Sequence, residues 1–186
     1  AANLPRDGSG RYYDGTARDN AGNTSARSLA NYARMDTPAP TLSATVAEPA
    51  YTGGPTNTIQ GGSATDSGVG GIEYQFCKNS ANSTAGCSGL NLSSWQSGNS
   101  YTFTGLTSGQ IYYYFVRARD ALSNMTSWST EVHSTQDNSN PTVSASNFSS
   151  TWYNSLRTAT VTAVVGISPV AEIRYSWGTN QMNGAC

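Results

Sequence analysis

Charge is scarce in this chain of 186 residues. Charged side chains make up 11% of it, lysine and histidine occur once each, and the formal net charge is −1. Such a chain offers no basic surface for a phosphate backbone, so nucleic acid is not an expected partner. No run approaches the ~20 apolar residues that a membrane-spanning helix needs, so no membrane insertion is expected within this segment.

Catalytic motifs are absent as well. The sequence has no HExxH pair, no nucleophile elbow and no phosphate-binding glycine loop. A Ser-His-Asp relay would depend on His133 alone, with Ser134 and Asp137 near it only in sequence, and a surface histidine is the simpler interpretation. We therefore expect a protein that is not an enzyme and holds no cofactor.

The aspartates do not form a recognisable metal motif. Asp19 and Asp120 each follow an arginine at the end of a predicted strand, where such a residue caps a hairpin by accepting hydrogen bonds from turn amides. Calcium needs six to eight oxygens, and the sequence does not bring Asp36, Asp66 and Asp137 together. No metal site is predicted, although a calcium ion near the linker residues Asp36 or Asp137 stays open as an alternative.

Hydroxyl and amide side chains take the place of charge, since Ser, Thr and Asn supply roughly a third of the chain, well above ordinary usage. Cys77 and Cys87 lie ten positions apart, and closing so short a loop is geometrically easy, so a local disulfide is predicted. Cys186 is left over, and the sequence does not identify its partner, for which a position beyond the chain given is one alternative. This usage favours an extracellular chain, secreted or at the cell surface, where disulfides persist.

The sequence repeats itself at a spacing of 101 residues without a gap. The matching pairs are Tyr12-Tyr13 with Tyr113-Tyr114, Ala17-Arg18-Asp19 with Ala118-Arg119-Asp120, Pro40-Thr41 with Pro141-Thr142, and Ile72-Glu73-Tyr74 with Ile173-Arg174-Tyr175. We therefore expect residues 1–36 to be the last part of one repeat, 37–137 a complete repeat, and 138–186 the first part of a third, all cut from a longer array.

Short strands and turns fill the complete repeat, and no helix is predicted. The expected strands are Thr41–Val46, Thr58–Thr65, Ile72–Cys77, Tyr101–Phe103, Tyr112–Ala118 and Thr126–Ser134, with residues 78–99 as a loop that carries one short strand. In the third repeat, Ile173, Tyr175 and Trp177 predict a further strand. Seven or so strands within about 100 residues indicate an all-β fold of tandem antiparallel β-sandwiches.

The residues from Tyr101 to Trp128 carry a family resemblance. Their pattern, Tyr-x-Phe-x-Gly-Leu-x-x-Gly-x-x-Tyr-x-x-x-Val-Arg-Ala-x-Asp-x-x-x-Asn-x-x-x-Trp, resembles fibronectin type III and related bacterial immunoglobulin-like repeats. The resemblance implies a structural corner in which Tyr112 packs near Leu106 and Gly109 and returns its hydroxyl to the backbone. The first repeat departs from it, because Arg11 stands at the position of Tyr112.

Four aromatic residues could form an exposed sugar-binding surface: Trp95, Tyr113, Phe115 and Trp128. The alternative is that strands simply favour such residues and that Trp128 covers the sandwich edge.

The main hypothesis is a non-catalytic segment of a bacterial extracellular repeat protein that serves as a stalk, fibre or adhesive scaffold. One alternative is a spacer module of a secreted polysaccharide-degrading enzyme, and a second is a filament subunit joined by strand complementation. The expected partners are neighbouring repeats or identical subunits, with cell-surface or carbohydrate ligands as further possibilities.

Overall fold

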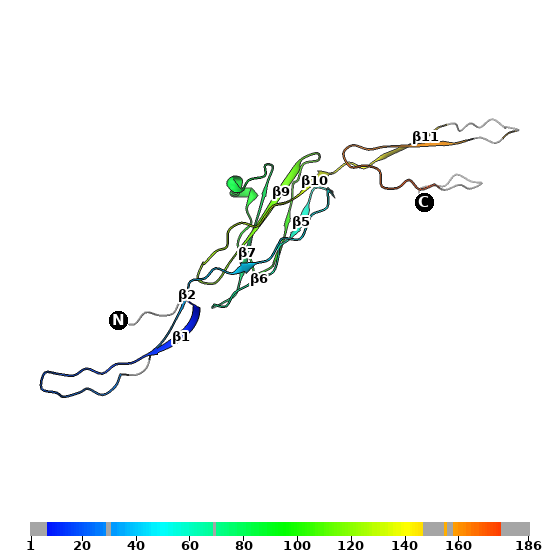
Figure 1. Cartoon of the computed structure of the whole chain (residues 1–186). Helices are drawn as coiled ribbons and strands as arrows, with labels where there is room; N and C mark the ends of the chain where they lie inside the picture. Colours follow the sequence, from blue (N-terminus) through cyan, green and yellow to red (C-terminus); the bar gives the residue numbers. More distant parts are fainter. Residues whose placement is uncertain (1–6, 29–30, 69, 147–154, 156–157, 176–186) are drawn as a thin grey trace.

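The computed structural model describes residues 7–28, 31–68, 70–146, 155 and 158–175. The chain is extended (Figure 1), with the hairpin of β1 (Asp7–Tyr13) and β2 (Asn31–Asp36) at one end and that of β11 (Thr142–Ser146) and β12 (Thr160–Val164) at the other. A β-sandwich lies between the two hairpins, so the predicted all-β fold is confirmed. No helix in the described part of the chain is long and apolar enough to cross a membrane.

One layer of the sandwich is a four-stranded sheet in the order β4 (Tyr51–Gly53), β10 (Val132–Asp137), β9 (Ile111–Arg119) and β7 (Glu73–Asn79). Strand β9 is antiparallel to both of its neighbours, whereas β4 pairs in parallel with β10. The loop after β7 adds a short stretch to the free edge, since the backbones of Tyr74 and Gln96 exchange two hydrogen bonds. The prediction of a loop that carries one short strand agrees with this bridge.

The other layer consists of two strand pairs, β5 (Asn57–Gln60) with β8 (Ser100–Phe103) and β3 (Thr41–Leu42) with β6 (Ala64–Thr65). Strand β8 agrees with its prediction and β3 is shorter than the predicted Thr41–Val46. The predicted strand Thr58–Thr65 is divided, because a glycine pair separates β5 from β6. A Cβ at Gly62 would overlap the carbonyl oxygen of Ser43, so the two backbones approach closely only without a side chain there.

Alternating residues of the facing strands fill the core. Fully or nearly fully buried are Ile59, Tyr74, Phe76, Phe103, Leu106, Tyr114, Val116 and Ala118. The rings of Phe103 and Tyr114 stack with their centroids 5.6 Å apart, and the ring of Tyr101 meets Phe103 edge-on at 4.8 Å. The period of two in β7 and β9 thus predicts correctly which side chains face inward.

The last strand of the sandwich begins at Val132, so the predicted strand Thr126–Ser134 is wrong over most of its length. The backbone amide of Ala118 donates to Thr126 Oγ1 and that of Val116 donates to Ser129 Oγ, both at 3.0 Å. Because these hydroxyls stand in for backbone carbonyls, residues 126–131 follow β9 without forming a regular ladder.

The β1–β2 hairpin pairs in the same register as β9 and β10. Tyr13 lies opposite Asn31, and 101 positions later Tyr114 lies opposite Val132. The turn between the strands also repeats, because Arg18 bridges Thr24 as Arg119 bridges Met125. The side chain of Arg11, which stands at the position of Tyr112, lies outside what the structure describes. The repeat boundaries stay predictions.

The third part of the chain forms less structure than predicted. In strand β12, exposed threonines alternate with the half-buried side chains of Val161 and Ala163. The strand predicted through Ile173 and Tyr175 is absent from the described residues there, and Tyr175 is 72% exposed. In the sandwich, β7 owes its regularity to pairing along β9, and residues 171–175 have no such neighbour among the residues described. Trp177 lies outside the described residues.

Candidate functional site

The disulfide between Cys77 and Cys87 forms as predicted, with the two Cα atoms 5.4 Å apart. It closes a loop that contains the single-turn helix η1 (Thr84–Gly86) and is followed by a second, η2 (Gly89–Asn91). The side chain of Ser83 caps η1 by accepting a hydrogen bond from the amide of Ala85. The bond therefore stabilises a polar loop that has no buried residues of its own in either helical turn.

The corner residues lie together after β8. Leu106 is 3% exposed, and the hydroxyl of Tyr112 accepts a hydrogen bond of 3.1 Å from the amide of Thr107. Gly109 has a φ of +83°, and its amide donates to the carbonyl of Gln136 at 2.7 Å. This left-handed conformation suits glycine, and the arrangement links the corner to the last strand of the sandwich.

Two of the predicted aromatic residues hold an arginine between them. The guanidinium carbon of Arg117 lies 4.4 Å from the ring centre of Trp128 and 5.3 Å from that of Trp95, and Arg119 lies 4.3 Å from Trp95. Burial lowers the pKa of Arg117, and the neighbouring charge of Arg119 adds to the effect. These cation–π contacts hold Trp95 and Trp128 against the sheet, so the two rings have a structural role.

Phe115 does not belong to an exposed surface, so that prediction is wrong. It is 5% exposed and lies opposite Cys77, which is fully buried. Opposite residues of an antiparallel pair share one face, so the outer face of the sheet is covered at this point. Tyr113 is half-buried on the same face, and its ring centre lies 5.4 Å from that of His133.

His133 contacts a carboxylate and no nucleophile among the described residues. Its Nδ1 lies 3.0 Å from Glu131 Oε2 on the surface. Ser134 points elsewhere, since its Oγ accepts hydrogen bonds from Thr52 Oγ1 at 3.0 Å and Asn57 Nδ2 at 3.3 Å. The interpretation of His133 as a surface histidine agrees with this geometry.

Asn57, which bonds Ser134, belongs to a polar group at one end of the sandwich. It is 6% exposed, and its Nδ2 also donates to Glu48 Oε2 at 2.7 Å. Burial raises the pKa of the Glu48 carboxyl, an effect that this hydrogen bond partly offsets, and burial also raises the pKa of Tyr114. Asn57 thus links Glu48 and Ser134 through hydrogen bonds within the fold, whereas the hydroxyl of Tyr114 is buried without a hydrogen-bond partner among the described residues.

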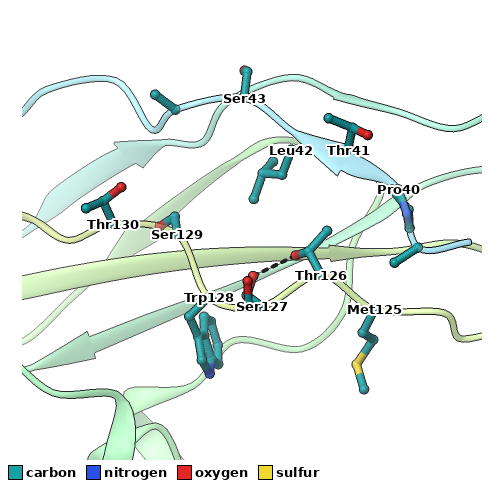
Figure 2. Close-up of a pocket in the computed structure, with 12 residues that line it drawn as sticks. Pro40, Thr41, Leu42, Ser43, Met125, Thr126, Ser127, Trp128, Ser129 and Thr130 are labelled. Carbon is teal, nitrogen blue, oxygen red and sulfur yellow. Dashed lines mark hydrogen bonds between the residues drawn. The ribbon is translucent and has the colours of Figure 1, made fainter.

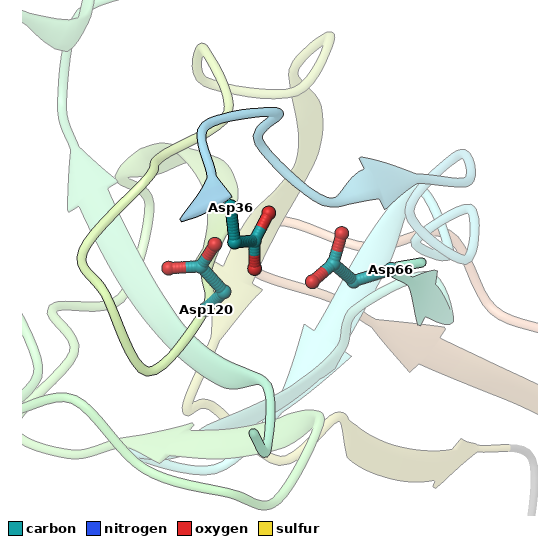
Figure 3. Close-up of side chains that lie close together, drawn as sticks. All are labelled: Asp36, Asp66 and Asp120. Carbon is teal, nitrogen blue, oxygen red and sulfur yellow. The ribbon is translucent and has the colours of Figure 1, made fainter. Parts of the chain in front are cut away.

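An acidic cluster that the sequence did not predict lies where residue 36 meets the sandwich (Figure 3). One carboxylate oxygen from each of Asp36, Asp66 and Asp120 lies within 4.8 Å of the others. Asp36 is 6% exposed and Asp120 is 1% exposed. Asp137, the other linker residue for which a calcium ion stayed open as an alternative, lies at the opposite end of the sandwich, where β10 ends.

Asp120 reaches the cluster through the hairpin turn predicted for it. Its Oδ1 accepts hydrogen bonds from the amides of Leu122 at 2.8 Å and Asn124 at 2.9 Å, and its Oδ2 accepts one of 2.6 Å from Asn124 Nδ2. Burial by itself would raise the pKa of Asp120, but these hydrogen bonds outweigh it and lower the pKa. Asp19 makes the same turn with Asn23, whose side chain lowers its pKa.

Asp36 is held against the loop after β6. A Cβ at Gly68 would overlap its carboxylate, and Asn124 Nδ2 donates to its carbonyl oxygen at 3.3 Å. The cluster thus joins the end of β2, the turn that opens with Asp66 and the hairpin that opens with Asp120.

An all-oxygen set of this kind suits a hard cation such as calcium or magnesium, or it can share a proton among its members. Three carboxylates supply only part of a calcium shell, so backbone oxygens or water would have to complete it. One sequence signal was available, because Asp66 and Asp120 each closely follow a predicted strand and Asp36 stands at a predicted repeat boundary. The expectation that Asp36 and Asp66 are not clustered is wrong.

A pocket of about 580 Å³ lies between residues 39–44 and 125–130. Figure 2 shows Leu42 and Trp128 on its opposite sides, with the hydroxyl of Thr126 bonded to Ser127. Every lining side chain is apolar or carries a hydroxyl, and none ionises. The pocket can therefore bind by contact and hydrogen bonding but cannot supply a general acid or base.

No protein-family model matches the chain, and no curated protein matches it. Solved structures that are similar to it include two at low sequence identity. The FN1-FN3 domains of chicken CNTN1 share 16% identity over 73% of this chain at a TM-score of 0.38, and the beta-1,2-glucanase from Parabacteroides distasonis shares 18% over 64% at 0.34. The chain spans 47% of the first and 16% of the second. At these scores the likeness carries no argument, and the sandwich rests on the strand order described above.

Proposed function

We propose that the chain is a non-catalytic segment of a bacterial extracellular repeat protein and that its sandwiches serve as a stalk, fibre or adhesive scaffold. The observation that supports this best is the shared register of β1–β2 and β9–β10 at a spacing of 101 residues. A chain that builds the same hairpin twice, in line along an extended molecule, is suited to separate two points in space (Figure 1).

The covalent and polar features support an extracellular location. The Cys77–Cys87 disulfide stabilises a loop that contains no core, and such bonds persist in oxidising compartments. The surface is wet by hydroxyls and amides, with only 11% charged residues in the whole chain. The pocket between residues 39–44 and 125–130 is lined by apolar and hydroxyl side chains, and His133 lies against Glu131 on the surface.

The two rival functions have less support. A spacer in a polysaccharide-degrading enzyme would need a sugar-binding surface or a catalytic neighbour, and Trp95 and Trp128 already pack against Arg117. In strand complementation, residues 171–175 of one copy would pair with the first hairpin of another copy, in the way that β7 pairs with β9 in the sandwich. The Glu73–Arg119 ion pair of 2.7 Å would then be replaced by Arg174 opposite Arg18, and like charges in that position are destabilising.

Two measurements test the proposal. Immobilised chain is assayed for capture of bacterial cells, host cells and matrix, and capture supports the adhesive role whereas clean absence of binding supports a stalk. Sedimentation velocity then reports whether the chain stays monomeric. Ordered polymers would favour the filament alternative, and a full-length gene that contained a catalytic domain would favour the enzyme spacer.

A further inference from the structure

The carboxylate of Asp137 joins the sandwich to the part of the chain that follows β12. Its Oδ1 accepts hydrogen bonds from the amide of Ser139 at 3.0 Å and from Ser139 Oγ at 2.5 Å. Its Oδ2 accepts a second pair from Ser168, at 3.0 Å from the amide and 2.6 Å from Oγ. Hydrogen bonds from Ser139 and then Ser168 hold the pKa of Asp137 well below its ordinary value, so the ionised form is the one that bonds.

The next linker residue is fixed from the sandwich side. Asn138 donates its amide to Ser108 Oγ and its Nδ2 to the carbonyl of Leu106, both at 2.9 Å. These acceptors belong to the corner that contains Gly109, and a Cβ built on Gly109 would lie 3.6 Å from Ile167 Cδ1. Residues 137–139 form the joint between the sandwich and the third part of the chain. They are hydrogen-bonded to both of these parts, unlike a free linker.

At the other end of the sandwich, the residue equivalent to Asp137 lies against the equivalent segment. At a spacing of 101, Asp36 corresponds to Asp137, and the segment Ser67-Gly68 corresponds to Ser168-Pro169, where Ser168 ends a bend. Asp36 packs on Gly68 so closely that a Cβ there would overlap its carboxylate. At each contact between successive units, the aspartate that ends the last strand of one unit therefore lies against the same segment of the next unit.

We propose that this last-strand aspartate is the docking residue of a repeating interface between successive units. The final aspartate and the corner form a surface at the end of one repeat. This surface contacts the segment after the second strand of the next repeat and fixes the angle between the two repeats. The partner that this surface fits is a further copy of the same repeat. This inference deepens the proposed function, on which it rests, because it makes the array a stiff rod and not a string of freely jointed domains.

The distance across the second joint tests the interface in the full 186-residue chain. Spin labels are attached at Thr58→Cys on β5 and Thr162→Cys on β12, both exposed positions, in a Cys186→Ser background that keeps the Cys77–Cys87 disulfide. Double electron–electron resonance at pH 7 then gives the distribution of distances between the labels. One narrow distribution is the expected result.

Asp137→Ala removes all four hydrogen bonds and is expected to at least double the width of that distribution, whereas Ser168→Ala removes only the hydroxyl donor on the other side of the interface and should widen the distribution less. Ser144→Ala on β11 is the matched control and should leave the width unchanged. Far-UV circular dichroism of each variant checks that the sandwich is folded. If Asp137→Ala does not fold, Ser168→Ala still tests the interface.

A broad distribution in the unsubstituted chain, or equal widths for Ser168→Ala and Ser144→Ala, overturns the interface. Either outcome leaves the proposed repeat-array function in place, because that function rests on the hairpin register. The proposed function fails by a different result, a full-length gene without further repeats.

Discussion

Replacing Phe115 by alanine separates what the structure shows from what the sequence predicts. The sequence places Phe115 on an exposed aromatic surface, where substitutions change the free energy of unfolding by about 0.5 kcal/mol or less. The structure leaves it 5% exposed, opposite the fully buried Cys77. Removal of a buried phenylalanine side chain costs about 3–5 kcal/mol, because the lost burial and the cavity left behind act together.

The size of this effect sets the design. A domain of this kind is stabilised by about 5–15 kcal/mol in total, so Phe115→Ala can remove a large fraction of the stability. Phe115→Leu is the milder variant and should cost about 1.5 kcal/mol or less, since it keeps most of the apolar volume. Tyr113→Ala is the matched control, because Tyr113 lies two positions earlier on the same face and is only half-buried.

Guanidinium unfolding at 25 °C, followed by circular dichroism with the disulfide intact, gives each free energy. The expected order of stability loss is Phe115→Ala, then Tyr113→Ala, then Phe115→Leu. A loss below about 0.5 kcal/mol for Phe115→Ala would show that the outer face of β9 is open and would restore the exposed aromatic surface.

Three further changes have expected outcomes in the same unfolding assay. Tyr112→Phe removes the hydroxyl that bonds the corner amide and should cost about 1 kcal/mol. Glu48→Gln should stabilise the chain at pH 7 and lose that gain in acid, since burial raises the pKa of Glu48 and its ionised form opposes folding until the pH falls through that pKa. Asp66→Asn should stabilise the chain by up to ~1 kcal/mol in the presence of a chelator, because it removes one of three neighbouring charges; an unchanged or lower stability would contradict mutual repulsion.

Most of the fold could be predicted because it depends on local periodicity. The inward residues of β7 and β9 follow the period of two, and the Asp120 turn follows from a short acceptor placed before free amides. Strand ends were less predictable. The hydroxyls of Thr126 and Ser129 replace backbone acceptors, and nothing in the alternation of residues 126–134 distinguishes that arrangement from a regular strand.

The aromatic residues show where a periodic argument stops. The alternation predicts that Phe115 points away from the core because Tyr114 and Val116 point into it. The inward direction of those two residues is correct, since both are fully buried. A face that points away from the core is exposed only if nothing covers it, and Phe115 lies beside the disulfide loop through its pairing with Cys77. The sequence predicted the disulfide and the outward face separately, but their proximity depends on the register of β7 against β9.

The acidic cluster depends on the same kind of long-range information across a joint. Asp36 ends one hairpin, whereas Asp66 and Asp120 belong to the sandwich, so their meeting is decided by the angle between two units. At the other joint Ile167 occupies the position of Asp66, and Asp137 there receives four hydrogen bonds from serines. The electrostatics of the two joints therefore differ. The first joint brings three carboxylates close together, whereas the second has one carboxylate that accepts hydrogen bonds. One repeat can therefore form joints of different polarity at the same docking position, because Asp66 in one joint is replaced by Ile167 in the other.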